Sequence, residues 1–204
     1  MRMGSLLERK DLRIIFDIIK PKSRVLDLGC GDGKLLKELI LNKKIRGLGI
    51  EASLQKIKSC LKSGVSVIQE DLNEGLIDFQ ENTFDYVILS QTLEYIANPL
   101  YLIQEMLRVG KNCIISFENL AYWKNRLTFL LRGTLKRSKI NENLFYGKKI
   151  QIFTVAKFFQ FCEYYKIQVS HKIFLPTQRY RLTHTFPNMF SKIAIFILKR
   201  SNLN

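Results

Sequence analysis

The sequence predicts an α/β domain whose sheet is mostly parallel, with helices on both faces and an antiparallel strand near the C-terminus. Over the first 119 residues, short apolar runs alternate with amphipathic segments, which is typical of parallel strands joined by right-handed helical crossovers. Nearer the C-terminus, two apolar runs are separated by too few residues for a helical crossover, so these strands should be antiparallel. A length of 204 residues fits one domain with its own core.

The first part of the chain contains five predicted strands. An amphipathic helix over residues 5–20 precedes them and ends before Pro21, because proline disfavours a helical conformation in the residue before it. The strands are expected at residues 24–28, 45–50, 65–69, 84–90 and 112–117, and the helices between them at residues 34–42, 53–62 and 99–108.

The second part of the chain has a different pattern. A helix is expected over residues 122–131, followed by a polar, basic stretch without periodicity over residues 133–150. Thr154 can cap a further helix that runs to about residue 165. The two antiparallel strands are expected at residues 167–175 and 191–199, joined by a loop over residues 176–187.

Basic and aromatic residues are concentrated in this second part. Residues 1–119 carry 17 basic and 16 acidic side chains, whereas residues 120–204 carry 16 basic and 2 acidic ones. Sixteen of the 23 aromatic residues also lie beyond residue 119. One interpretation is a surface for nucleic acid or an acidic partner, and the other is an ordinary surface with many lysines. Because most of the basic residues occur singly, the second interpretation is favoured.

The composition excludes several classes of protein. With 47% hydrophobic and 25% charged residues, the chain is unlike disordered or collagen-like sequences. Its longest apolar runs, such as residues 193–198, are far shorter than the roughly 18 residues that a membrane helix needs. Charged side chains near the N-terminus stand where a signal peptide has its apolar core. We therefore expect a cytoplasmic protein without membrane association.

The cysteines and histidines form neither a metal-site nor a disulfide pattern. The two histidines lie thirteen residues apart, and no two cysteines form a CxxC pair. Zinc sites and disulfide frameworks need closer groupings. We expect no metal site, and we expect the cysteines to pack as small apolar residues in a reducing compartment. The residues concerned are Cys30, Cys60, Cys113, Cys162, His171 and His184.

A glycine-rich turn, Asp27–Gly33, follows the first predicted strand and precedes a helix. Gly29 and Gly31 allow positive φ angles and remove Cβ atoms, so a ligand can lie against the backbone. Gly33 lets the helix start close to the sheet. Such a turn also serves simply to join a strand to a helix, so the turn alone is weak support for a ligand site.

Acidic residues at the ends of two further strands strengthen the prediction. Glu51 ends the second strand, 24 residues after Asp27, and Asp71 follows the third strand after another 20 residues. A carboxylate at the end of the second strand can accept hydrogen bonds from both hydroxyls of a ribose. Three acids at successive strand ends place three acceptors along the sheet edge where open α/β folds bind ligands.

The charge of the turn indicates which cofactor binds there. The pyrophosphate of a dinucleotide prefers a helix N-terminus free of acids, whereas Asp27 and Asp32 flank this turn. An acidic turn suits a ligand with ammonium and sulfonium charges, such as S-adenosylmethionine (SAM). In this interpretation Asp27 meets the methionine moiety, Glu51 the ribose, and Asp71 the adenine amino group. The alternative is a domain without a ligand, in which the strand-end acids are coincidental.

Four segments together resemble one protein family: Val25–Gly33, Gly64–Leu72, Phe84–Leu93 and Glu105–Gly110. On these segments the chain resembles the class I SAM-dependent methyltransferases and, more narrowly, the methionine biosynthesis protein MetW family. The family continues with a Pro-Asn-Phe-Gly-His-Trp stretch, of which this chain keeps only Asn119 and Trp123. The loop that follows is shortened here, and a histidine usual in the family is replaced by Gln151.

The resemblance implies a Rossmann-like, seven-stranded methyltransferase domain over residues 1–204. Its SAM-binding half spans residues 22–119, and an acceptor or partner half spans residues 120–204, with a loop insertion near residues 133–153. SAM or S-adenosylhomocysteine is the implied cofactor. The expected cofactor-binding residues are Asp27, Gly29, Cys30, Gly31, Gly33, Glu51, Asp71, Leu72 and Ser90.

Four residues are candidates for the acceptor side of this site. Ser90 and Gln91 end the fourth strand, where a methyl acceptor would approach the sulfonium, although such side chains also cap ordinary turns. Asn119 and Trp123 can form the far wall, or pack within the core. No residue is a convincing general base, and methyl transfer does not require one when alignment supplies most of the acceleration.

Three functions follow from these observations. The resemblance implies a SAM-binding protein of methionine biosynthesis that acts with a homoserine O-acyltransferase. The second function is an active methyltransferase for a small molecule or a macromolecule. Methylation of RNA is the weakest, because the sequence after the fourth strand, Ser90–Leu93, offers no proline-aromatic platform for a flipped base.

Overall fold

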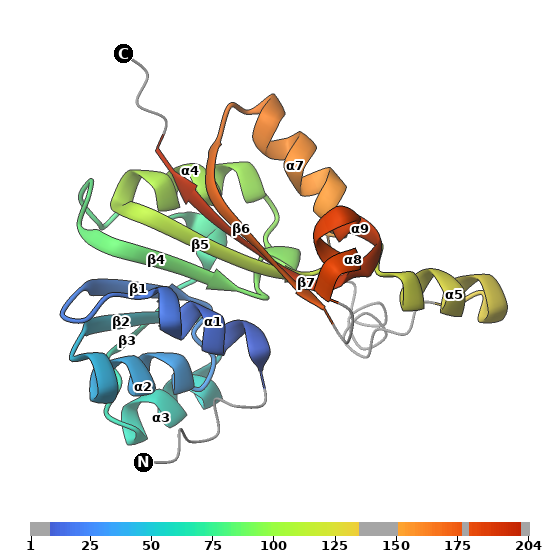
Figure 1. Cartoon of the computed structure of the whole chain (residues 1–204). Helices are drawn as coiled ribbons and strands as arrows, with labels where there is room; N and C mark the ends of the chain where they lie inside the picture. Colours follow the sequence, from blue (N-terminus) through green and yellow to red (C-terminus); the bar gives the residue numbers. More distant parts are fainter. Residues whose placement is uncertain (1–8, 135–150, 177–179, 201–204) are drawn as a thin grey trace.

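A mixed sheet forms the centre of the computed structural model, which describes residues 9–134, 151–176 and 180–200 (Figure 1). Within these residues the sheet has seven strands in the order β3-β2-β1-β4-β5-β7-β6. The strands are β1 (Arg24–Leu28), β2 (Arg46–Glu51), β3 (Val67–Gln69), β4 (Phe84–Ser90), β5 (Gly110–Glu118), β6 (Gln168–Pro176) and β7 (Ser191–Lys199).

Strand direction agrees with the prediction from the sequence. The strands β3, β2, β1, β4 and β5 are parallel, whereas β7 runs antiparallel to both of its neighbours, β5 and β6. The predicted α/β class, with a mostly parallel seven-stranded sheet and an antiparallel C-terminal strand, is therefore confirmed.

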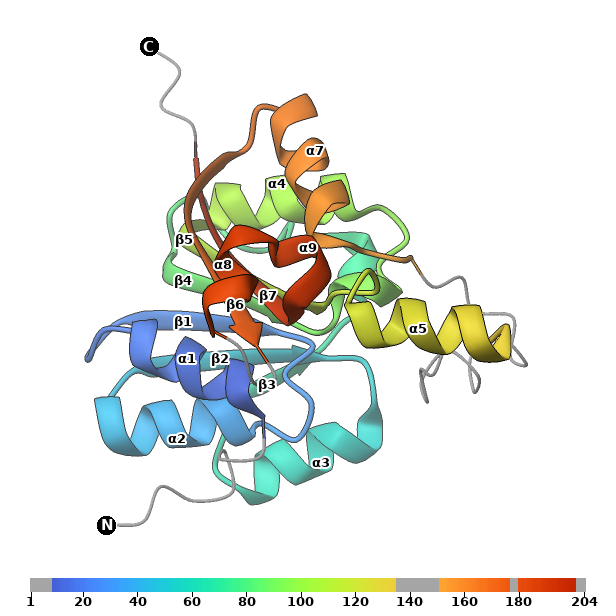
Figure 2. The ribbon, with the colours of Figure 1, turned by 45° about the vertical axis from the view of Figure 1, so that its right-hand side comes forward.

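Helices cover both faces of the sheet (Figure 2). One face packs against α1, α2 and α3, and the other packs against α4 and α7. This arrangement follows from strand geometry, because successive side chains point to opposite faces. In β1, the Val25 side chain packs in the core beneath α1, α2 and α3. The side chains of Leu26 and Leu28 pack in the core on the opposite face, beneath α4 and α7. The helices are α1 (Lys10–Ile18), α2 (Lys34–Lys43), α3 (Leu54–Lys62), α4 (Pro99–Val109), α5 (Trp123–Arg132), α7 (Val155–Tyr164), α8 (Tyr180–Thr185) and α9 (Pro187–Phe190).

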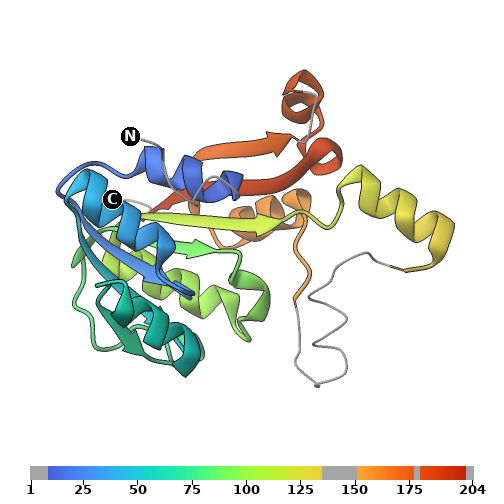
Figure 3. The ribbon, with the colours of Figure 1, turned by 90° about the horizontal axis from the view of Figure 1, so that it is seen from below.

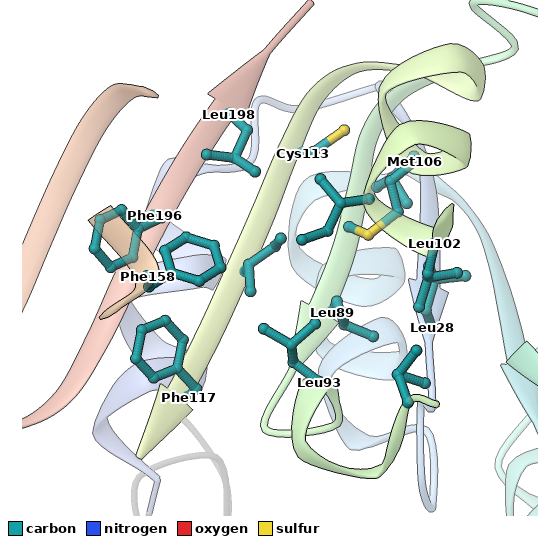
Figure 4. Packing of buried hydrophobic residues seen from close by; sticks show 14 of the residues in the cluster. Leu28, Leu89, Leu93, Leu102, Met106, Cys113, Phe117, Phe158, Phe196 and Leu198 are labelled. Carbon is teal, nitrogen blue, oxygen red and sulfur yellow. The ribbon is translucent and has the colours of Figure 1, made fainter. Parts of the chain in front are cut away.

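Aromatic side chains from the second part of the chain fill one of these cores. Phe117 of β5 packs against Phe158 of α7 and Phe196 of β7, with ring centroids 5.0 and 5.8 Å away (Figure 4). Phe153 and Phe174 are also buried. Part of the aromatic enrichment beyond residue 119 therefore serves the core rather than a binding surface.

Some elements differ from those predicted. The short helix α8 lies within the loop predicted over residues 176–187, and α9 begins at the last residue of that loop. Helices of six and four residues are too short for periodicity to reveal. The single-turn 3₁₀ helices η2 (Leu72–Glu74) and η3 (Leu93–Tyr95) were missed for the same reason. Most of the predicted polar stretch, residues 135–150, and the start of the predicted first helix, residues 5–8, lie outside the described residues.

Helix α5 extends away from the sheet (Figure 3). None of its residues is buried, and the side chains of Leu127, Phe129, Leu130 and Leu131 are between 45% and 80% exposed. Its basic residues, among them Arg126 and Arg132, are exposed as well. Part of the basic second half of the chain is thus displayed on a projecting helix.

Candidate cofactor site

The candidate site lies at the carboxyl edge of the sheet, around the ends of β1, β2 and β4. β1 pairs with β2 on one side and with β4 on the other. Strands β2 and β3 therefore extend the sheet to one side of β1, and β4 and β5 extend it to the other. Open α/β sheets bind ligands at such a switch point. The glycines of the predicted turn follow directly after Leu28, the last residue of β1.

The three glycines of this turn have different roles. All three adopt positive φ, +68° at Gly29, +64° at Gly31 and +74° at Gly33. A Cβ atom at Gly29 would lie 2.7 Å from the Thr92 side chain, and one at Gly33 would lie 3.0 Å from Cys60 Sγ, whereas one at Gly31 would meet nothing within 4 Å. Gly29 and Gly33 are therefore required for packing, and Gly31 presents an open backbone surface.

Glu51 connects the end of β2 to this turn. Its side chain is nearly buried, with 9% exposed, and Oε2 accepts a hydrogen bond from Gly31 N at 2.9 Å. Oε1 accepts from Ser53 N at 3.0 Å, and Lys56 Nζ lies 3.8 Å from Oε2. Glu51, the residue predicted to bind the ribose, thus lies directly beside the open backbone of the turn. Its hydrogen bond to Gly31 N also fixes the shape of that turn.

Asp27 places a second carboxyl group at the base of the turn. It is 4% exposed, and burial raises its pKa to about 7, while the nearby positive charge of Arg9 lowers the pKa and the charge of Glu51 raises it. Desolvation dominates because a buried carboxylate loses the hydration that stabilises its charge. A carboxyl group poised near neutrality is available to pair with a cationic ligand.

The residues after β3 supply the third part of the predicted site. Asp71 is exposed and caps η2, with Oδ1 accepting from Asn73 N at 3.0 Å and from Asn73 Nδ2 at 2.7 Å. Leu72 is buried in the core. The predicted adenine-side residues are thus held by a local turn at the same edge of the sheet.

The cysteines of the turn region are structural. Cys60 is buried and Cys30 is half-buried, so the expectation of burial is met fully by Cys60 and only partly by Cys30. Burial, and then the charge of Asp27, raises the pKa of the Cys30 thiol well above its usual range. Cys30 is therefore neutral near pH 7 and a poor nucleophile.

Ser90 and Gln91 point into a polar network at the end of β4. Ser90 Oγ lies 3.2 Å from Asp11 Oδ2 and 3.1 Å from Ser116 Oγ. Gln91 adopts a positive φ of 52°, and its Nε2 donates to the same Asp11 oxygen at 3.2 Å. A non-glycine residue held in this strained region is frequent at functional sites.

The centre of this network, Asp11, is a functional candidate that the sequence analysis missed. It is fully buried, and its carboxylate also accepts hydrogen bonds from Ser116 Oγ at 3.1 Å and from Arg9 Nη2 at 2.6 Å. One signal was available in the sequence. Asp11 precedes the buried residues Ile15 and Ile19 at intervals of four, so an acid occupies a position on the apolar face of α1.

Asn119 and Trp123, the other two acceptor-side candidates, lie beyond the end of β5. Asn119 is buried, and its Nδ2 donates to Asn188 O and Ser191 O at 3.0 and 2.9 Å. Its Oδ1 accepts from the backbone of Ala121 and Val155 at 3.2 and 3.3 Å. Trp123 begins the projecting helix α5. The Asn119 amide thus fixes the end of β5, and the acceptor-side role of both residues stays a prediction.

The described residues contain neither a membrane-spanning helix nor a metal-ligating cluster. No helix among them is both long and apolar enough to cross a membrane. The same part of the chain contains no group of three or more histidine, cysteine, aspartate or glutamate side chains placed to hold a metal ion.

Solved structures with the same architecture identify the fold. The chain superimposes on a SAM-dependent methyltransferase from Archaeoglobus fulgidus with a TM-score of 0.63 at 19% identity, covering 97% of this chain and 95% of that one. It also matches phosphoethanolamine N-methyltransferase 2 of Haemonchus contortus, solved in complex with SAM, with a TM-score of 0.67 at 12% identity, covering 97% of this chain and 52% of that one. The fold is therefore the Rossmann-like fold of the class I SAM-dependent methyltransferases.

Sequence relatives narrow the family. The chain is 40% identical over 131 residues to the bifunctional methionine biosynthesis protein MetXA/MetW of Rhodopirellula baltica, a match that covers 60% of this chain and 21% of that protein. The chain thus spans less than half the length of the first curated relatives that it matches. The family model described as methionine biosynthesis protein MetW matches residues 9–198. This chain belongs to the MetW family of methionine biosynthesis proteins.

Proposed function

We propose that this chain is a cytoplasmic SAM-binding protein that acts in methionine biosynthesis together with a homoserine O-acyltransferase. The observation that carries the cofactor assignment is the position of the Glu51 carboxylate, 2.9 Å from the backbone nitrogen of Gly31 and beside the buried Asp27. This pair of acids forms a cradle around an open glycine backbone, and it suits a cationic nucleoside better than a dinucleotide.

The residues of the cradle fit the parts of SAM or S-adenosylhomocysteine. Asp27 is placed for the ammonium group, Glu51 for the ribose hydroxyls and Asp71 for the adenine amino group, while Leu72 lies beside the adenine. Gly29, Cys30, Gly31 and Gly33 form the turn against which the ligand lies, and Ser90 borders the site on the side of β4. The complex of the Haemonchus contortus methyltransferase with SAM supports this assignment through the shared fold.

The proposed partner rests on a relative that combines two parts in one chain. The Rhodopirellula baltica protein is named as a bifunctional MetXA/MetW, so in that organism a MetW part is joined covalently to a MetXA part. Parts that are fused in one organism frequently associate as separate chains in another. We infer that this chain binds a homoserine O-acyltransferase, and that SAM bound to this chain signals the pathway's end product to that enzyme.

The alternative function is an active methyltransferase for a small molecule. SAM supplies a methyl group on a good leaving group, so the chain would need mainly to align an acceptor beside Ser90 and Gln91. The polar groups that Ser90 and Gln91 share with the buried Asp11 at this strand end favour such an orienting role. Purified chain that methylates a small metabolite and never associates with the acyltransferase would establish this alternative over the accessory function.

The Asp27 carboxyl predicts how SAM affinity depends on pH. Burial raises the Asp27 pKa to about 7, and pairing with an ammonium group requires the ionised form. Affinity is therefore expected to rise about fivefold between about pH 6 and pH 7, where Asp27 ionises and the ammonium group of SAM keeps its proton, and to fall again above about pH 8 as that proton is lost. Calorimetric titrations at these pH values test this prediction.

Asp27→Asn provides the matched control for this experiment, because it removes the titration and retains the shape. The variant should bind SAM weakly at each pH and should show no rise between about pH 6 and 7. A wild-type affinity that stays constant between about pH 6 and 7 would contradict the assignment of Asp27 to the ammonium group.

Charge reversal on α5 tests the partner proposal. Arg126 and Arg132 are exposed on a helix that contains no acidic residue, so they can steer an acidic partner surface. Reversing both to glutamate should slow association with the acyltransferase by about tenfold at low salt, with a smaller effect at high salt. Surface plasmon resonance gives both rates, and Lys37→Glu on α2, an exposed site in the neutral half, is the control. An equal effect of the control would argue against an α5 interface.

A further inference from the structure

The Arg9 side chain occupies a defined position beside the end of β4. Its Nε and Nη2 atoms donate to the two oxygens of Asp11, at 3.3 and 2.6 Å. Nη2 also lies 2.7 Å from Ser90 Oγ. Asp11 is itself fixed by Gln91 and by the buried Ser116. A flexible side chain at the start of α1 is thus oriented by a buried carboxylate.

The position of Ser90 places this guanidinium beside the glycine turn. Ser90 ends β4, and its neighbour Leu89 pairs with Leu28, the last residue of β1. Two residues later, the Thr92 side chain packs against Gly29, where a Cβ would lie within 2.7 Å of it. The guanidinium therefore lies at the junction of β1 and β4, on the side of the turn where Asp27 is buried. The influence of the Arg9 charge on the Asp27 carboxyl agrees with this placement.

The guanidinium of Arg9 and the buried carboxyl of Asp27 carry opposite charges at one strand junction. Together they can pair with the two charged groups of a zwitterion. The α-amino acid end of SAM carries an ammonium and a carboxylate on the same carbon, so a site that binds both groups needs opposite charges a short distance apart. We propose that Arg9 binds the α-carboxylate of SAM, while Asp27 receives the ammonium group. This inference rests on the proposed SAM site. It assigns recognition of the α-carboxylate, and hence of the amino acid end of the ligand, to the Arg9 guanidinium.

Two features distinguish this arrangement from an ordinary ion pair. The Arg9 side chain is 43% exposed while that of Asp11 is fully buried, so part of the guanidinium faces solvent, where a ligand can reach it. The contacts of Arg9 use Nε and Nη2, and within the described part of the chain no hydrogen bond engages Nη1. A planar guanidinium held at one edge presents its other edge to a carboxylate.

Ligands that differ only in the carboxylate test this proposal. Calorimetry is used to measure the affinities of wild-type and Arg9→Ala protein for SAM and for decarboxylated SAM, which keeps the sulfonium and ammonium charges. The titrations are run at several pH values between about 7 and 8.5, so that ionisation of Asp27 and of the amino group of each ligand is separated from loss of the Arg9 contact. Wild type should prefer SAM by about 10- to 100-fold, the range for a charge-assisted hydrogen-bonded pair. Arg9→Ala should lose this preference by binding SAM more weakly, with decarboxylated SAM changed less than about threefold.

Control variants separate binding from a structural role. Lys10→Ala removes a neighbouring exposed charge and should leave both affinities unchanged, while Arg9→Lys should retain only part of the preference for SAM. Equal losses for the two ligands in Arg9→Ala, or a wild type that does not discriminate between them, would overturn the role of Arg9 and leave the SAM site standing. Failure of wild type to bind either ligand would instead overturn the proposed SAM site, and this inference with it.

Discussion

Asp11→Ala is expected to lower the free energy of unfolding by about 2 to 4 kcal/mol. The substitution removes the acceptor of hydrogen bonds from Ser90, Gln91 and the buried Ser116, and a buried donor without its acceptor costs about 1 to 3 kcal/mol. It also releases α1 from the ends of β4 and β5. Urea unfolding followed by circular dichroism measures the change directly.

Asp17→Ala is the matched control, because Asp17 is an exposed acid on the same helix. Its effect should stay within about 0.5 kcal/mol, as for most surface substitutions. If the two variants unfold at the same urea concentration, Asp11 does not anchor α1, and the orientation of Arg9 then loses its physical basis.

Loss of SAM binding is the second large effect, and it is expected for two substitutions in the cradle. Glu51→Ala should weaken binding by about 10- to 150-fold, because two hydrogen bonds to a charged acceptor are lost. Gly31→Val should weaken binding further, because its branched side chain fills the open surface where a Cβ meets no other atom within 4 Å. Isothermal titration calorimetry gives both affinities.

Each of these substitutions has a control that separates ligand contact from folding. Gly64 also has a positive φ, +76°, and an open Cβ position, but it lies after α3 rather than in the turn. Gly64→Val therefore carries the same backbone strain without blocking the site. For Glu51, which also accepts from Gly31 N and Ser53 N, Glu51→Gln keeps one acceptor oxygen and should give an intermediate loss. Unchanged SAM affinity in both Glu51→Ala and Gly31→Val would remove the proposed cradle.

The sheet and its helices were predictable because their signals are local. Each parallel strand is a short apolar run, and each covering helix shows apolar residues at helical spacing, so order and direction follow from the connection lengths. The turn at residues 27–33 and the acid at Glu51 were predictable for a similar reason. Strand ends meet at one edge of a parallel sheet, so acids at successive strand ends must come close together.

Residues whose roles depend on distant partners were not predictable in this way. The position of Asp11 on the apolar face of α1 is unusual for an acid, but its partners Ser90 and Ser116 lie 79 and 105 residues away in the sequence, so its role follows only from the fold. Arg9 gains its orientation only from that contact. The Asn119 amide binds backbone groups near residues 121, 155, 188 and 191, which the sequence does not place near one another.

The most direct test of the proposed function is the association of this purified chain with the homoserine O-acyltransferase of the same cell. Surface plasmon resonance, with the acyltransferase immobilised and the chain injected with and without saturating SAM, measures both binding and its dependence on the cofactor. The proposal predicts a saturable complex whose affinity changes when SAM is added, and a Gly31→Val chain that binds without responding to SAM. No association in either condition would contradict the accessory function.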